Sequence, residues 1–155
     1  MNPIRPSLRS TLFEAIRRYG WFPLAVFLAH ELCAHVLHAY ARWPSIDIPL
    51  HFFGGLAIAY FTGGVLRVAA ARGLVRAPDP ILRVLLLFAL ACTAAVFWEF
   101  AEWLADRTIG TACQLGLDDT LLDLFMGLLG GFAYLLPQLP DAFRNFFRSS
   151  PETPS

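Results

Sequence analysis

The sequence has little charge and no lysine. Only 15% of its 155 residues are charged, and all 12 basic residues are arginine, whereas about 25% of a typical soluble domain is charged. Hydrophobic residues make up 57% of the chain, and its mean hydropathy is +0.55. This composition excludes a disordered chain, a nucleic-acid-binding protein and most classes of cytosolic enzyme, and it indicates a membrane protein.

Cysteine is also scarce. Cys33, Cys92 and Cys113 are odd in number, lie far apart and form no CxxC pair, so they predict neither a disulfide framework nor a thiolate metal site. A zinc-protease signature is absent too, because His35 follows His30 at an offset of five residues rather than four. We expect the cysteines to act as small packing residues.

Four apolar stretches approach the length of about 20 residues that a membrane-spanning helix needs. The third and fourth are the clearest, because residues 84–98 and 124–139 contain no charge. We predict an all-α, polytopic membrane protein whose four-transmembrane-helix bundle occupies residues 21–140. The predicted spans are residues 21–40, 50–71, 81–104 and 119–136.

The ends of the chain differ from this bundle. Within residues 1–20, the spacing of Leu8, Leu12, Ile16 and Tyr19 marks one face of a helix among several arginines. We predict a cytoplasmic, amphipathic interfacial helix there, and we expect the first span to be retained because no signal-peptide cleavage site follows it. Residues 141–155 form the predicted cytoplasmic tail, which is rich in Ser and Pro at its end.

The arginines predict the orientation in the membrane. Ten of the 12 precede the first span, surround the connection between the second and third, or follow the fourth, whereas only Arg42 and Arg107 lie on the other side. Basic residues beside spans are kept in the cytoplasm. We therefore expect a protein of the plasma (bacterial inner) membrane with both termini in the cytoplasm.

This orientation brings ionisable side chains into one layer at the extracytoplasmic ends of the spans. Within each span they are three or four residues apart, as neighbours on one helix face are: Asp47 and His51, Glu99 and Glu102, and Asp119 and Asp123. Charge inside a membrane is costly and usually faces a protein interior or a water-filled cavity. We interpret His51, Glu99, Glu102 and Asp123 as a functional cluster.

Other polar residues of the spans leave alternatives open. Asp47 and Asp118 are either helix caps or members of the site, and Asp106 is expected to be a solvated residue at a helix end. Glu31, near the middle of the first span, either pairs with His35 or belongs to a proton path. The role of His38 stays open.

Small and aromatic residues complete the predicted bundle. Trp43, Trp98 and Trp103 suit an interfacial aromatic belt. Small residues allow membrane helices to approach closely, and we expect this role for most glycines of the second and fourth spans: Gly54, Gly55, Gly63, Gly64, Gly127, Gly130 and Gly131.

Three segments together resemble a known family. They are Asp47-Ile-Pro-Leu-His51-Phe52, Trp98-Glu99-Phe-Ala-Glu102-Trp103, and residues 119–131 with Asp119, Asp123 and three glycines. Their order and spacing resemble the signature blocks of the YjdF-like inner-membrane proteins of unknown function and, more distantly, VanZ-like membrane proteins. The resemblance implies a four-helix membrane protein in which these acidic residues and His51 matter, and the VanZ link implies cell-envelope physiology and glycopeptide resistance.

The predicted cluster leaves three functions open. Carboxylates with an imidazole are the ligands of a hard or borderline divalent cation, so the leading hypothesis is a metal site acting on a lipid or lipid-linked envelope substrate. Its candidate ligands are Asp47, His51, Asp119 and Asp123, with Glu99 or Glu102 as general base. The alternatives are an ion- or proton-coupled transporter acting as a homo-oligomer, and a non-catalytic membrane adaptor. No residue identifies a reaction, so the sequence leaves open whether the protein is an enzyme.

Overall fold

The computed structural model describes residues 7–149. It leaves out residues 1–6 and 150–155, and the side chains of His35, Ala41, Pro44, Phe146, Arg148 and Ser149. The predictions for the Ser/Pro-rich end of the tail therefore fall mostly outside the described residues. The predicted pairing of His35 with Glu31 falls outside them as well.

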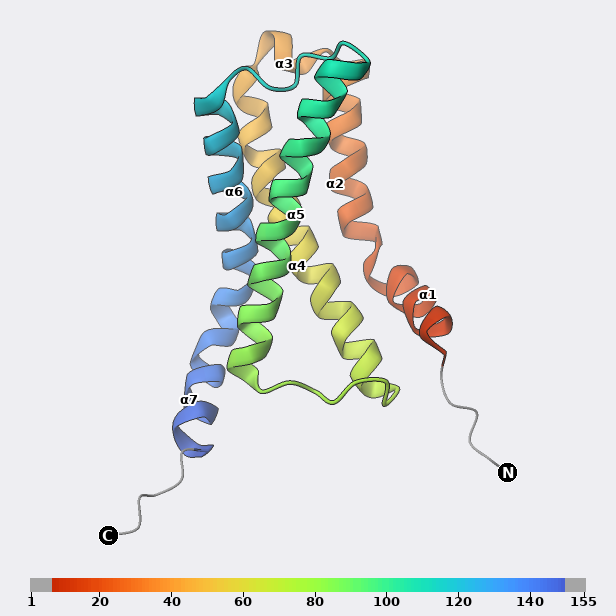
Figure 1. Ribbon diagram of the computed structural model, residues 1–155, viewed down its shortest axis with the longest axis vertical. Helices are drawn as coiled ribbons and strands as arrows, with labels where there is room; N and C mark the ends of the chain where they lie inside the picture. Colours follow the sequence, from red (N-terminus) through yellow and green to blue (C-terminus); the bar gives the residue numbers. More distant parts are fainter. Residues whose placement is uncertain (1–6, 150–155) are drawn as a thin grey trace.

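Every regular element of the described chain is helical, which confirms the all-α prediction (Figure 1). Besides α-helices, the described chain has a π-helical segment, Leu32–Val36, and two 3₁₀ turns, Pro44–Ile46 and Leu136–Gln138. The α-helices are α1 (Leu8–Tyr19), α2 (Trp21–Glu31), α3 (Ala39–Arg42), α4 (Asp47–Ala71), α5 (Pro80–Thr108), α6 (Leu117–Leu135) and α7 (Leu139–Ser149).

Three helices of the described chain are long and apolar enough to cross a membrane: α4, α5 and the run Leu117–Asn145 that begins with α6. The first predicted span is shorter than expected, with an apolar helix over Trp21–Ala34. It ends early because α2 passes into a π-helical segment, Leu32–Val36, and His38 then adopts a left-handed conformation (φ 48°). These changes interrupt the hydrogen-bond ladder of an α-helix.

Glycines bring α4 and α6 into direct backbone contact, as their spacing predicted. A Cβ atom added to Gly55 would overlap the carbonyl oxygen of Gly127, and one added to Gly130 would overlap the carbonyl oxygen of Phe52. Close approach of this kind is a common way of packing membrane helices. It fixes the first turns of α4 against the middle of α6, next to the predicted cluster.

Helix α1 packs at the other end of the bundle, beside the last turns of α4 (Figure 1). Arg72, the residue that follows α4, contacts Glu14 and donates to the hydroxyl oxygen of Ser10 at 2.9 Å. Leu8 and Ile16, on the predicted apolar face of α1, stay exposed. This exposure is what an interfacial helix would present to lipid.

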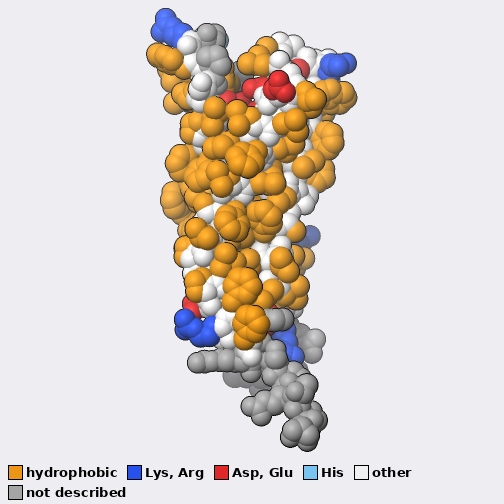
Figure 2. All heavy atoms as spheres, turned by 90° about the vertical axis from the view of Figure 1, so that its left-hand side faces the viewer, with side chains coloured by type: hydrophobic (Ala, Val, Ile, Leu, Met, Phe, Trp, Pro, Cys, Tyr) orange, Lys and Arg blue, Asp and Glu red, His pale blue; other side chains and the backbone are white. Residues whose placement is uncertain are grey.

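The surface has the pattern of a membrane protein. Hydrophobic side chains cover most of the visible face between the two ends, and most of the visible charged side chains lie near those ends (Figure 2). Large apolar side chains such as Phe97, which is 67% exposed, and Leu85, which is 60% exposed, point outward from α5. Such an apolar outer surface suits contact with lipid.

Candidate metal centre

His51 is the centre of the buried polar cluster. Its imidazole lies on the second turn of α4, and the residue is only 8% exposed. Its Nε2 atom lies 3.3 Å from Asp47 Oδ1, 3.8 Å from Asp123 Oδ1 and 4.0 Å from Glu102 Oε1, and its Nδ1 atom lies 3.6 Å from Glu99 Oε1. Three helices thus bring five of the six predicted site residues together.

Asp47 belongs to this cluster rather than acting as a helix cap. It is the first residue of α4, and Ile46 before it occupies the capping position without a side-chain hydrogen bond. One turn of helix separates Asp47 from His51, so both side chains lie on one face. The 3.3 Å contact with the imidazole places Asp47 beside His51, and its role as a metal ligand stays a prediction.

Helix α5 supplies two buried carboxylates, Glu99 and Glu102, which are 6% and 5% exposed. The indole of Trp98 donates from Nε1 to Glu102 Oε1 at 2.8 Å. Trp98 therefore bonds a carboxylate of the cluster, although its sequence position suggested an interfacial belt. Its spacing of one helical turn from Glu102 was the sequence feature that could have predicted this contact. Gln114 donates from Nε2 to Glu99, to the backbone oxygen at 3.0 Å and to Oε2 at 3.2 Å.

The loop between α5 and α6 is held by Asp106. One carboxylate oxygen accepts from the Thr111 hydroxyl at 2.6 Å and from the Cys113 amide at 2.8 Å, and the other accepts from the Gln114 amide at 3.0 Å. Asp106 is thus more than a solvated residue at a helix end, because it holds the backbone of this loop. Because Asp106 fixes the backbone of Gln114, it positions the side chain that bonds Glu99.

Asp119 and Asp118 lie apart from this contact set. Asp119 Oδ2 accepts from the backbone amide of Leu115 at 3.0 Å, which ties the loop to the first turn of α6. Asp118 is exposed. The structure therefore places Asp123 beside His51, whereas Asp119 bonds the loop backbone. The role of Asp119 as a metal ligand stays a prediction.

His30 of α2 and Tyr40 of α3 lie near the cluster. The Tyr40 hydroxyl lies 2.9 Å from His30 Nδ1. Burial and the nearby carboxylate of Asp47 raise the pKa of Tyr40, so the hydroxyl keeps its proton. Sequence reasoning missed Tyr40 because it lies in a short helix without apolar periodicity. Glu31 is half-buried and His38 is exposed, and neither is among the contacts of His51 given above.

Three buried polar atoms of the cluster have no hydrogen-bond partner of good geometry: Asp47 Oδ1, His51 Nε2 and Glu99 Oε1. Buried polar atoms are normally bonded, and an exception suggests an ion or a water. Two groups have ligand atoms within 4.8 Å of one another, Asp47–His51–Asp123 and His51–Glu99–Glu102. Two ligands of one cation lie at most about 4–5 Å apart, twice the metal–ligand distance, so either group fits a divalent ion.

The negative charge of the cluster also requires a positive counter-charge. Four carboxylates surround one imidazole within 4.0 Å in buried surroundings. Unpaired charge is costly in a protein interior and within a membrane. A divalent cation or bound protons must therefore offset part of the negative charge.

The apolar spans and this buried centre define a polytopic membrane protein with a candidate cation site. The chain belongs to the family described as "Predicted membrane protein (DUF2238)", which matches residues 14–138. It is 36% identical over 107 residues to an "Uncharacterized protein" of Thermotoga maritima, covering 68% of this chain and 53% of that protein. The chain thus spans about half the length of this relative. No solved structure matches the chain.

Proposed function

We propose that the cluster binds a divalent metal ion through Asp47, His51 and Asp123. One observation carries this proposal: His51 Nε2 is buried and forms no hydrogen bond of good geometry, although the carboxylates of Asp47 and Asp123 lie 3.3 and 3.8 Å from it. A neutral imidazole nitrogen and two carboxylate oxygens form a common ligand set for borderline divalent cations.

In this proposal Glu99 orients the imidazole. A ligating histidine usually donates its other ring N–H to a carboxylate, which fixes the tautomer. Glu99 Oε1 is 3.6 Å from Nδ1, and a small side-chain rotation would bring the pair to hydrogen-bond distance. Glu102 is the better candidate for a general base because its Oε1 lies on the Nε2 side of the ring, at 4.0 Å.

We further propose that the site faces the extracytoplasmic side and acts on a lipid or lipid-linked envelope substrate. The distribution of the arginines supports this orientation, and the resemblance to YjdF-like and VanZ-like proteins supports a role in the cell envelope. A divalent cation would supply Lewis acidity toward a phosphoryl or carbonyl oxygen. Glu102 would accept a proton, and the buried helices would limit access of bulk water.

Elemental analysis of the protein purified in detergent tests the metal site. Asp123→Asn keeps the size of the side chain but removes its charge, and Asp118→Asn is the matched control because Asp118 is an exposed acid of the same helix. We expect a stoichiometric divalent metal in the wild type and in the control, and its loss in Asp123→Asn. A wild-type protein that stays metal-free when divalent salts are added would refute the proposal.

Ion- or proton-coupled transport by a homo-oligomer is the second candidate, favoured by the excess of buried carboxylates around His51. The double variant Glu99→Gln/Glu102→Gln separates the two. Loss of proton-coupled uptake in proteoliposomes, with metal content unchanged, would favour transport. A purely structural adaptor fits less well, because a polar cluster that only locks helices together should form hydrogen bonds of good geometry. Asp47 Oδ1 and Glu99 Oε1 instead face the ring nitrogens of His51 at 3.3 and 3.6 Å without forming one.

A further inference from the structure

An apolar hollow of about 470 Å³ adjoins the cluster. It lies among α2, α4 and α5, and its size falls in the range of about 300–1,000 Å³ that is usual for small-molecule sites. Small residues of α4 and α5 leave this space open because their side chains are too small to fill it. Its walls include Gly54, Ala57, Ala91, Ala94 and Ala101, with Pro23 and Phe27 of α2 opposite.

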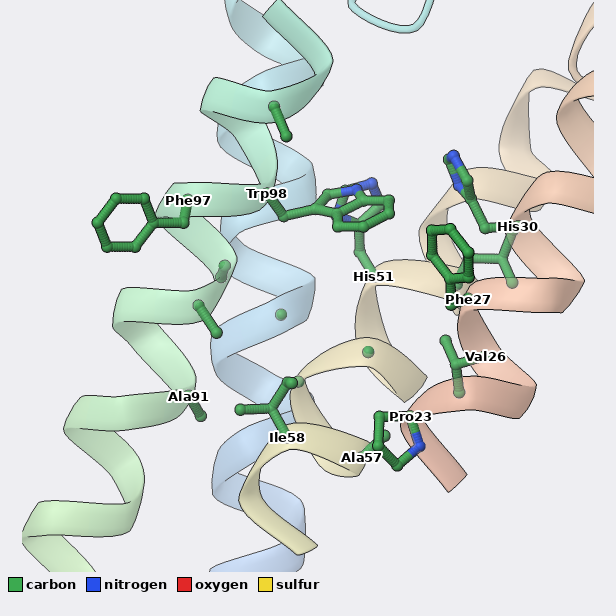
Figure 3. Close-up of a pocket in the computed structure, with 17 residues that line it drawn as sticks. Pro23, Val26, Phe27, His30, His51, Ala57, Ile58, Ala91, Phe97 and Trp98 are labelled. Carbon is green, nitrogen blue, oxygen red and sulfur yellow. The ribbon is translucent and has the colours of Figure 1, made fainter. Parts of the chain in front are cut away.

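Polar groups gather at one end of the hollow. His30, His51 and Trp98 lie across its upper part, whereas Pro23 and Ala57 lie across its lower part (Figure 3). Trp98 is also the donor to Glu102, so this end of the hollow reaches the candidate metal centre. A molecule with an apolar chain and a polar head would match both ends.

The length and depth of the hollow correspond to one leaflet of a bilayer. Its wall on α5 extends from Ala91 to Ala101, which is about 15 Å at 1.5 Å per residue. The hydrocarbon core of a bilayer is about 30 Å thick. The hollow thus runs from the polar cluster to about the middle of the membrane.

The hollow is open toward the lipid beside α5. Ala101 of α5 and Phe27 of α2, which is 45% exposed, both line it and are exposed. Phe27 approaches Trp98 edge-on with ring centroids 6.3 Å apart. Gly54 is not a packing glycine, since a Cβ atom there would meet nothing within 4 Å, unlike one at Gly55. The space at Gly54 is therefore free for a ligand.

We propose that this hollow binds one hydrocarbon chain of a membrane lipid, which enters sideways and brings the lipid's polar head to His51 and its carboxylates. This lipid site rests on the proposed function, because the bound lipid would be the substrate of the metal site. Both an acyl chain and a polyisoprenyl chain have the required chemistry. Chain binding itself depends on the apolar walls and not on a metal.

Fluorescence in nanodiscs tests chain binding. Trp98 becomes the single fluorophore once the exposed Trp21, Trp43 and Trp103 are replaced by Phe, and the nanodisc contains phosphatidylglycerol with brominated acyl chains as quencher. We expect strong quenching in this protein, and loss of most of the quenching when Gly54→Leu or Ala94→Leu fills the hollow. Ala89→Leu is the matched control, an exposed position of α5 outside the hollow, and should quench like the parent.

Added polyisoprenyl phosphate distinguishes the two chains: recovery of fluorescence identifies a polyisoprenyl ligand, and unchanged quenching identifies an acyl chain. Helical circular dichroism of each variant shows whether it has folded, and its metal content is measured separately. If folded Gly54→Leu and Ala94→Leu both stay quenched like Ala89→Leu, the chain site is refuted even though the metal is bound. If quenching depends on the hollow but no variant or parent binds metal, the proposed function fails and the lipid site stands.

Discussion

Replacing Glu99 by Gln should weaken metal binding without abolishing it. Glu99 Oε1 faces Nδ1 of His51 at 3.6 Å, away from the Nε2 atom that faces Asp47 and Asp123. Loss of an outer carboxylate that orients a ligand typically lowers metal affinity 10- to 100-fold, which is about 1.4–2.7 kcal/mol. The Gln amide oxygen can still accept the Nδ1 proton, so we expect a loss near the lower bound, about tenfold.

A titration of the detergent-solubilised protein against a chromophoric metal indicator measures this loss. Asp141→Asn is the control, because the Asp141 side chain is 75% exposed beside Arg144 at the other end of the protein, and its affinity should equal that of the wild type. If Glu99→Gln loses stoichiometric binding as completely as Asp123→Asn, then Glu99 is itself a ligand, in the group with His51 and Glu102. Unchanged affinity would show that Glu99 does not orient the imidazole.

Three further predictions concern packing, the loop and sidedness. Gly130→Ala should destabilise the protein by about 1–3 kcal/mol, because its methyl group overlaps the α4 backbone, and thermal unfolding should show no such loss for Gly54→Ala. Asp106→Asn cannot accept all three loop hydrogen bonds, so hydrogen exchange of the loop amides should become about 10- to 100-fold faster; exchange at the wild-type rate would contradict the role of Asp106. In a background without native cysteines, an impermeant maleimide should label Asp118→Cys in intact cells but Arg76→Cys only after permeabilisation, and the reverse pattern would overturn the orientation.

The cluster was predictable because helix geometry and membrane depth restrict it. Asp47 and His51 are one turn apart at the start of a span, and Glu99 and Glu102 are one turn apart near the end of another, so antiparallel neighbours place them at one level. Asp123 joins them by the same reasoning. What the spacing could not give is which atom faces which, since this depends on how the helices rotate against one another.

The supporting residues were harder to predict. Gln114 and Asp106 act through a loop whose hydrogen bonds follow no sequence period, so nothing in the chain linked Gln114 to Glu99. The end of the first span was mispredicted for a related reason. Apolar length suggested a helix to Tyr40, but local backbone changes at the π-helical segment and at His38 ended it earlier.

Two adjacent glycines explain how one helix serves both the cation site and the apolar hollow. Successive residues of an α-helix point about 100° apart, so Gly54 and Gly55 face different neighbours. Gly55 lies against the backbone of Gly127, and this close contact between α4 and α6 allows the short side chain of Asp123 to come within 3.8 Å of His51. Gly54 faces open space in the hollow. A larger side chain at Gly55 would separate the ligands, whereas one at Gly54 would fill only the space that we assign to a lipid chain.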